Sequence, residues 1–325
     1  MKSIKVAILT RPHYRSQRFL AEGLARMFHR LGIEADVFLQ GISWLEAAGN
    51  KGGGFANYFR AARLARQITK LDDYDLFILS DTMRAFQDDV NLQPLKKTGK
   101  PIIHYEVFFA GGSKHWMERL PADALDKFDA YLVASSIHGF KPIGSYKVFP
   151  IGLDVLPRHP FLTRKSEFTA LLDFPREGYG EQRGIQENAL RRLGIRTIRL
   201  EGEYTYQEIE KIYQQTSIAF VSFPEAFGLP IAQLQYYGAY IASPDRMWVM
   251  RHALLPQGAA YFDDHAPNFT DNFLFYRNEE DLTKYLTELM KKYDPSIVRS
   301  RFVKYQPQYA QGDPGVLWDA IRQFC

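Results

Sequence analysis

Residues 218–245 read IAFVSFPEAFGLPIAQLQYYGAYIASPD, and this stretch indicates the fold class of the chain. The apolar start, IAFVS at 218–222, is typical of a buried strand, and Pro230 suits the first turn of a helix over 230–237. A second short apolar stretch, YIA at 240–242, follows as another strand. A strand, a loop, a helix and a strand in this order predict an α/β protein with a parallel sheet.

The same alternation runs through the rest of the chain and falls into two groups, separated by the proline-containing stretch 150–160. The first group comprises expected strands 4–9, 34–39, 76–79, 101–105, 130–134 and 147–149 and expected helices 16–31 and 55–71. The second comprises expected strands 168–174, 197–200, 218–222 and 240–242 and expected helices 185–193, 206–214, 230–237 and 281–292.

We therefore expect an α/β chain with two Rossmann-like, doubly wound domains, over 1–152 and 153–306. The apolar residues of a short helix over 315–324 need a partner surface, so we expect the segment 307–325 to pack back on the first domain. Ligands of open α/β sheets bind beyond the carboxyl ends of the strands, which places the functional loops around a shared cleft.

Composition excludes several classes of protein. The 325 residues are 46% hydrophobic and 24% charged, which indicates a folded globular chain. The sole cysteine is Cys325, so neither an intramolecular disulfide nor a multi-cysteine zinc site can form. No apolar run approaches the length of a membrane span, and the N-terminus does not resemble a signal peptide. We expect a cytoplasmic protein.

The loop 223–229, FPEAFGL, carries the chemistry of a binding site. Backbone N–H groups of Phe227, Gly228 and Leu229, at the positive end of the following helix, are suited to hold a phosphate. Glu225 is suited to accept hydrogen bonds from hydroxyl groups. The alternative is an ordinary strand-to-helix turn with a surface glutamate.

The run 222–245 resembles the donor-site segment of nucleotide-sugar glycosyltransferases with the GT-B fold, of the family 4 (group 1) type, whose typical form is E-G-F-G-L-P-x-x-E. Three further segments are similar to that family in the same order: VFPIGLD at 148–154, the run 202–222, and the loop 168–184. The resemblance implies two Rossmann-like domains facing a cleft, with the nucleotide sugar bound by the second.

The resemblance also implies roles for individual residues. Glu225 matches a glutamate that contacts the transferred sugar, and Gln233 falls where the family has a glutamate that grips the ribose. An amide at Gln233 departs from that pattern but keeps hydrogen-bonding capacity. Arg176 and Arg183 correspond to a basic pair that neutralises the diphosphate leaving group. Each could instead be a solvated surface arginine.

In the first half, two strand ends contribute candidates. Arg11, after the first strand, is a candidate for donor phosphates, and Arg15 and Glu106 are candidates on the acceptor side. His104 is a candidate catalytic residue at a strand end, with a hydrogen-bonded structural histidine as the alternative. No group of histidines and carboxylates shows convincing metal-ligand spacing, so we expect neither a metal nor another cofactor.

Charge differs between the halves: residues 1–150 carry 21 basic and 15 acidic side chains, and residues 151–325 carry 20 and 22. A basic helix face is expected over 55–71, with Arg60, Arg63 and Arg66, and it suggests peripheral contact with an anionic inner membrane face as an alternative to a solvated surface. The basic excess is too small and lacks the aromatic platform expected for nucleic-acid binding.

Together these features predict a retaining, metal-independent glycosyltransferase of the hexosyltransferase type, acting in polysaccharide or glycoconjugate biosynthesis. Its donor would be a UDP- or GDP-linked sugar, and its acceptor a hydroxyl on a glycan, a lipid-linked carrier or a small molecule. One alternative is a catalytically silent GT-B protein that binds nucleotide, motivated by Gln233. A weaker one is an NAD(P)-dependent oxidoreductase, based on GYGEQRG at 178–184 with Glu201.

Overall fold

The computed structural model describes residues 4–10, 15–39, 70–80, 89–107, 123–134, 146–155, 165–224, 229–244, 248–249 and 271–324. For residues 15–18, 39, 89–91 and 206–207 it describes the backbone alone. The chain forms two compact units. Unit 1 comprises Met1–Asp154 together with Gln311–Cys325, and unit 2 comprises Val155–Ala310.

Unit 1 contains a six-stranded parallel sheet in the order β2-β1-β3-β4-β5-β6. Its strands are β1 (Lys5–Thr10), β2 (Glu34–Leu39), β3 (Leu76–Ser80), β4 (Ile102–Glu106), β5 (Ala130–Val133) and β6 (Val148–Pro150). The strands are apolar because a parallel sheet is covered on both faces. Short 3₁₀ turns precede β3 and β5, at Leu71–Asp73 and Leu125–Lys127.

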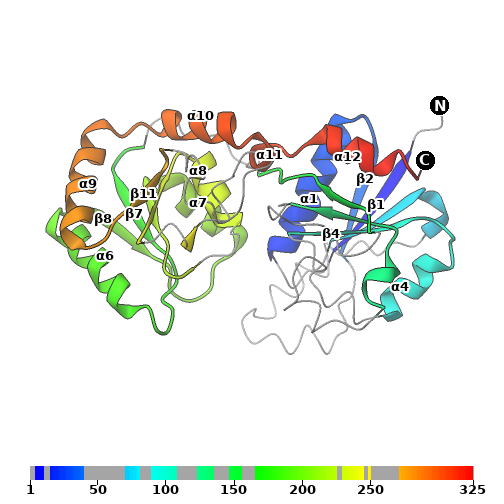
Figure 1. The fold of residues 1–325 in the computed structure, drawn as a ribbon, viewed down its shortest axis with the longest axis horizontal. Coiled ribbons are helices and arrows are strands. Elements are labelled where there is room, and N and C mark those ends of the chain that lie inside the picture. Colours follow the sequence, from blue (N-terminus) through cyan, green and yellow to red (C-terminus); the bar gives the residue numbers. More distant parts are fainter. Residues whose placement is uncertain are drawn as a thin grey trace. The chain divides into compact units, whose positions relative to one another are not determined.

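Two layers of helices cover this sheet (Figure 1). Helices α1 (Arg15–Arg30) and α12 (Pro314–Ile321) contact each other, and α1 packs on β1, β2 and β3 while α12 packs on β5 and β6. On the opposite face, Leu92 and Leu95 of α4 (Asp89–Lys96) belong to a buried cluster with Leu9 and Phe77. The C-terminal helix is therefore part of unit 1.

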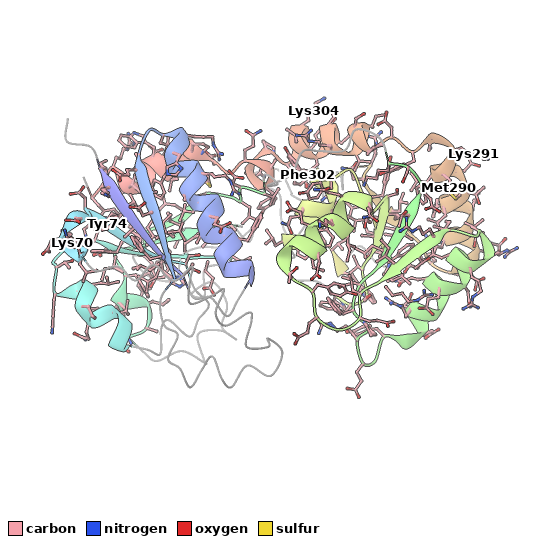
Figure 2. All side chains as sticks on the ribbon, turned by 180° about the vertical axis from the view of Figure 1, so that it is seen from behind. Lys70, Tyr74, Met290, Lys291, Phe302 and Lys304 are labelled. Carbon is pink, nitrogen blue, oxygen red and sulfur yellow. The ribbon has the colours of Figure 1, made fainter. Side chains whose placement is uncertain are left out.

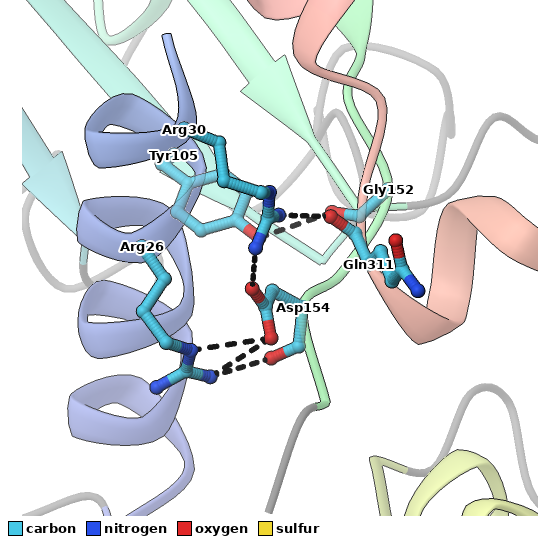
Figure 3. A network of polar contacts seen from close by, with 6 residues as sticks. All are labelled: Arg26, Arg30, Tyr105, Gly152, Asp154 and Gln311. Carbon is cyan, nitrogen blue, oxygen red and sulfur yellow. Dashed lines mark hydrogen bonds and ion pairs between the residues drawn. The ribbon is translucent and has the colours of Figure 1, made fainter. Parts of the chain in front are cut away.

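The chain leaves and re-enters unit 1 at one point, where buried Asp154 bonds to two arginines of α1 (Figure 3). Its Oδ1 lies 3.0 Å from Nη2 of Arg26, and its Oδ2 lies 2.7 Å from Nη1 of Arg30. Arg30 also donates a hydrogen bond to the carbonyl of Gln311, which forms an antiparallel bridge with Asp154. Both chain crossings are thereby fixed to α1.

Unit 2 contains a five-stranded parallel sheet in the order β11-β10-β9-β7-β8. The strands are β7 (Thr169–Leu172), β8 (Arg196–Arg199), β9 (Ile218–Phe220), β10 (Tyr240–Ser243) and β11 (Phe273–Phe275). Its helices are α6 (Gly180–Arg192), α7 (Tyr206–Gln215), α8 (Leu229–Tyr236), α9 (Glu279–Lys292), α10 (Pro295–Tyr305) and α11 (Pro307–Ala310).

The helices of unit 2 lie on both faces of its sheet, as Figure 1 shows. Leu190 of α6 and Leu286 of α9 join a core cluster on one face, and Tyr213 of α7 and Leu234 of α8 join a second cluster on the other. In Figure 2, Phe302 of α10 is a buried residue, whereas Lys291 and Lys304 are exposed. None of the helices in the described ranges is long and apolar enough to cross a membrane.

Side-chain caps explain where several helices begin. Thr205 forms a capping box with Glu208 at the start of α7, and Asn278 accepts a hydrogen bond from the N–H of Asp281 at the start of α9. Asp294 and Asp313 cap α10 and α12, each followed by a proline in the first turn.

Three elements were not expected from the sequence. Helix α4 contains Pro94 in its interior, which disfavours a helix on local grounds, and β11 has only three residues. Helix α10 was missed although its Asp-Pro start is a recognisable signal. Helix α6 begins at Gly180 rather than at 185, because its first turn carries glycines and no apolar spacing. The expected helix 55–71 lies almost entirely outside the described residues.

Candidate functional site

The carboxyl edge of the unit 2 sheet contains a topological switch point between β7 and β9. These strands are hydrogen-bonded neighbours, with Leu172 opposite Phe220, but β7 connects to β8 on one side and β9 to β10 on the other. In doubly wound sheets, ligands bind in the crevice formed where the connections diverge. The loops that start at Asp173 and Val221 border this point, and they are the loops that the sequence selected.

Part of the predicted motif lies outside the described residues. Glu225, Phe227 and Gly228 fall in that gap, so their roles stay predictions. The structure describes the approach to the motif as far as Pro224 and the helix that begins at Leu229. Because α8 follows β9, its N-terminal N–H groups lie at the carboxyl edge of the sheet, where they favour an anion.

Arg176 lies across the switch point. Its side chain starts from the loop after β7, and its Cζ lies 4.5 Å from the ring centroid of Phe223 in the loop after β9. The residue is exposed, and it makes no ion pair with another described residue. A cation–π contact of this kind contributes about 0.5–1 kcal/mol and leaves the guanidinium edge available. Arg176 is therefore placed to bind an anion.

Arg183 is placed differently from the sequence interpretation, which put it in a loop beside Arg176. It lies in the first turns of α6, and its side chain is 16% exposed. Its Nη1 donates to the carbonyl of Asp173 at 2.7 Å, and its Nε lies 3.3 Å from Oε1 of Glu187. These bonds occupy the guanidinium with protein partners. Arg183 thus holds the loop that carries Arg176.

Glu187 links Arg183 to Arg199 at the end of β8. Its Oε1 lies 3.1 Å from Nε of Arg199, so a single carboxylate oxygen accepts from both arginines. Burial raises the pKa of the Glu187 carboxyl, but hydrogen bonds and charges of Arg199 and Arg183 outweigh it and lower the pKa below its usual value. The Glu187 carboxylate therefore stays ionised at neutral pH.

Asp173 is a candidate that the sequence analysis did not select. It follows β7 directly and is half-buried, and the charges of both arginines act on its carboxyl. Burial raises its pKa, while the N–H of Phe174 and the charges of Arg176 and Arg183 act in the opposite direction. A polar residue that ends a buried strand of the switch point was the available signal.

The remaining donor-site candidates lie on α8. Leu229 is its first residue and is partly exposed. Gln233 lies in the middle of the helix and is only 5% exposed, so its amide is buried in unit 2. The contact of Gln233 with a ribose stays a prediction. A side chain buried in this way has little surface on which to bind a ligand.

In unit 1, the position of His104 differs from the expected strand end. Strand β4 continues to Glu106, and His104 is 1% exposed within it. Its ring centroid lies 5.0 Å from that of Phe128 and 6.0 Å from that of Tyr131. This aromatic burial is typical of a structural histidine. Glu106 is partly exposed at the strand end, whereas Arg11 and the Arg15 side chain lie outside the described residues.

Unit 1 has its own switch point, between β1 and β3, and two hydroxyl groups lie there. Thr10 and Ser80 end these strands, pair in register, and are 2% and 0% exposed. Neither hydroxyl oxygen has a hydrogen-bond partner among the described residues. A hydroxyl residue at the end of each apolar strand is the signal in the sequence that marks this position.

Comparison with known proteins places this architecture in the GT-B fold class. No protein-family model and no curated protein matches the chain. A UDP-GlcNAc 2-epimerase from Neisseria meningitidis, solved with UDP-GlcNAc bound, aligns over 98% of this chain and all (100%) of its own, with a TM-score of 0.53 and 9% identity. Another UDP-N-acetylglucosamine 2-epimerase aligns over 100% and 97%, with a TM-score of 0.51 and 12% identity.

Glycosyltransferases are also among the similar structures. The spinosyn forosaminyltransferase SpnP aligns over 99% of both chains at 13% identity, with a TM-score of 0.47. At 9% and 12% identity, the alignments with the two epimerases show a shared fold and nothing narrower. The narrower assignment to glycosyltransferase family 4 stays a prediction.

Proposed function

We propose that this protein binds a nucleoside diphosphate sugar at the β7/β9 switch point of unit 2 and transfers the sugar to a hydroxyl acceptor. The observation that carries the proposal is Arg176, an exposed cation that crosses this point and contacts Phe223, two residues before Glu225. The similarity of 222–245 to a donor-site segment supports it, as does a solved structure of the same fold that holds UDP-GlcNAc.

In the proposed reaction, charge develops on the departing diphosphate. Arg176 and the N-terminus of α8 stabilise that charge without a metal ion, while Arg183 keeps the Arg176 loop in place. Glu225 supports the developing positive charge on the sugar. The departing phosphate accepts the proton of the acceptor hydroxyl, and the configuration at the anomeric carbon is retained.

The test measures turnover and binding with UDP-GlcNAc, UDP-glucose, GDP-mannose and dTDP-glucose, with a chelator present. Arg176→Ala removes charge-assisted hydrogen bonds to the diphosphate, so its affinity for UDP should fall about 10- to 100-fold. Glu225→Ala should abolish transfer. Arg196→Ala is the matched control, because Arg196 is the first residue of β8 and so lies at the amino edge of the sheet, away from the carboxyl edge that carries the proposed site. Equal effects of Arg176→Ala and Arg196→Ala would contradict this site.

UDP-GlcNAc 2-epimerisation is a second candidate, favoured by the two epimerases that share the fold. The two activities differ in their need for an acceptor. NMR of UDP-GlcNAc incubated with the protein alone distinguishes them, because an epimerase forms UDP-N-acetylmannosamine without an acceptor. A transferase leaves the donor intact or hydrolyses it slowly.

A silent nucleotide-binding protein is the remaining alternative, motivated by Gln233 in place of a glutamate. Binding of UDP without turnover of any donor would identify it, and activity gained in Gln233→Glu would show that the site had decayed. Acceptor identity and peripheral membrane contact stay predictions, since the basic segment 55–69 lies outside the described residues.

A further inference from the structure

A buried glutamine of α6 reaches the loop that leads to the proposed sugar site. Gln186 is completely buried, and its Nε2 donates to the carbonyl of Val221 at 3.2 Å and to Oη of Tyr276 at 2.9 Å. These partners follow β9 and β11 respectively. One amide group thus connects a helix to two strand ends at the carboxyl edge of unit 2.

Val221 is the first residue beyond β9, and its backbone N–H and carbonyl are each bonded to a different element. Its N–H donates to the carbonyl of Ala242 at 3.0 Å, and its own carbonyl accepts from Gln186. The backbone is therefore held by β10 and by α6 just before Ser222, Phe223 and Pro224. These are the last described residues before Glu225 in the sequence.

The same helix holds the other side of the switch point. Arg183, three residues before Gln186, donates to the carbonyl of Asp173 in the loop that carries Arg176. Helix α6 therefore bonds to the first residue after β7 and to the first residue after β9. A shift of α6 changes both loops together.

The Gln186 side chain is not fully satisfied by hydrogen bonds with the described residues. Oε1 of Gln186 is buried and has no hydrogen-bond partner in the described part of the chain. A buried acceptor without a partner costs about 1–3 kcal/mol, which offsets much of what the two hydrogen bonds of Nε2 contribute. The amide therefore adds little net stability to unit 2, and an incompletely satisfied polar group in a core is typical of functional sites.

We propose that Gln186 is a positioning residue, which aligns the Arg176 loop and the backbone at Val221–Pro224 for sugar transfer. The proposal rests on the proposed function, because it assigns Gln186 a task in that same site. Its amide acts through the Val221 carbonyl and contacts no substrate. Tyr276 supports it by accepting the second hydrogen, and the N–H of Tyr276 donates to the carbonyl of Ser243 at 3.3 Å.

Gln186→Met removes both donors and keeps the shape of the side chain. We expect kcat with the donor that wild type uses to fall about 10- to 100-fold, because small misplacements of reacting groups have effects of this size. Affinity for UDP should stay within about threefold, since Arg176 remains. The Val221 carbonyl and the Tyr276 hydroxyl lose a donor, so we expect thermal stability to fall by about as much as in the control variant, which also breaks buried amide hydrogen bonds. Gln235→Met is the control: Gln235 is equally buried, but its amide contacts Asn272 and its own helix.

A second variant and an activity-independent readout complete the experiment. Tyr276→Phe should lower kcat in the same direction, and the double variant should resemble Gln186→Met, because both act through one amide. Hydrogen exchange at Val221–Phe223 should become faster in Gln186→Met. Wild-type kcat per folded molecule in Gln186→Met, or unchanged exchange there, would overturn the proposal. An inactive wild type refutes the proposed function instead, and exchange then decides the role of Gln186.

Discussion

Replacing Asp154 by Asn tests whether the two chain crossings of unit 1 depend on its charge. The Asp154 side chain is 0% exposed and pairs with Arg26 and Arg30, each 32% exposed. Asparagine preserves the shape but turns an N–H group toward a guanidinium and leaves two arginines without a counter-charge. Removing one partner of a buried ion pair costs about 3–5 kcal/mol.

The expected loss is smaller than that, because both arginines keep other partners. Nη2 of Arg26 still donates to the carbonyl of Asp154 at 3.0 Å, and Arg30 still donates to the carbonyl of Gln311. Partial exposure also lets water solvate them. We therefore expect a loss of about 2–4 kcal/mol, which lowers the Tm of unit 1 by about 5–12 °C.

Differential scanning calorimetry measures this shift, and Asp319→Asn is the matched control. Asp319 pairs with Arg322 at 3.1 Å in the same unit, but their side chains are 55% and 60% exposed. An exposed pair contributes about 0–1 kcal/mol, so the Tm of the control should change by no more than about 3 °C. Equal shifts in the two variants would refute the argument that buried charge fixes the crossings.

Two further predictions concern unit 2. Burial lowers the pKa of Lys165 to about 7, from 10.5 in the unfolded chain, so between these pH values the unfolded state binds more protons and the free energy of unfolding rises with pH. Lys165→Met should abolish this rise when it is measured by chemical unfolding at several pH values, and an unchanged pH dependence would contradict the argument. Gly238 has a φ of +82°, and a Cβ there would lie 2.5 Å from Cβ of Pro295. Gly238→Ala should therefore lose more than 2 kcal/mol, whereas Gly194→Ala, at φ +64° with no atom within 4 Å of its Cβ, should lose only about 1–2 kcal/mol. Similar losses by urea unfolding would contradict the steric argument.

Local sequence determines the strands of this fold to a large extent. Strand β2 occupies 34–39 as predicted, and most other strands shift by only one or two residues, because buried parallel strands are continuous apolar runs. Helix α6 was predicted too short, since the glycines of its first turns hide a start that is fixed by long-range contacts. Helix α4, with Pro94, forms where burial of Leu92 and Leu95 outweighs local propensity.

The candidate site was less predictable than the strands. Motif similarity selected the loops after β7 and β9, and the sheet order brings their starting points together. The sequence could not show that the Arg183 guanidinium bonds to Glu187 and to the Asp173 carbonyl. Nor could it show that the rings of Phe128 and Tyr131 pack against His104. The neighbours of Arg183 are close in the chain but depend on where α6 begins, and those of His104 lie far from it in the chain. The same is true of Gln186, whose partners lie 35 and 90 residues away.

Unit 1 is formed by two separate stretches of the chain, and this affects the order in which the units are completed during translation. Arg30 binds a carbonyl that lies 281 residues later in the chain, so the ribosome needs about 15–60 s more to deliver that partner. Unit 2 is one continuous segment and is fully translated before α12 is made. The unit whose sequence begins first is therefore the last to be completed, and until then α1 and the edge of the sheet at β6 are without the helix that covers them.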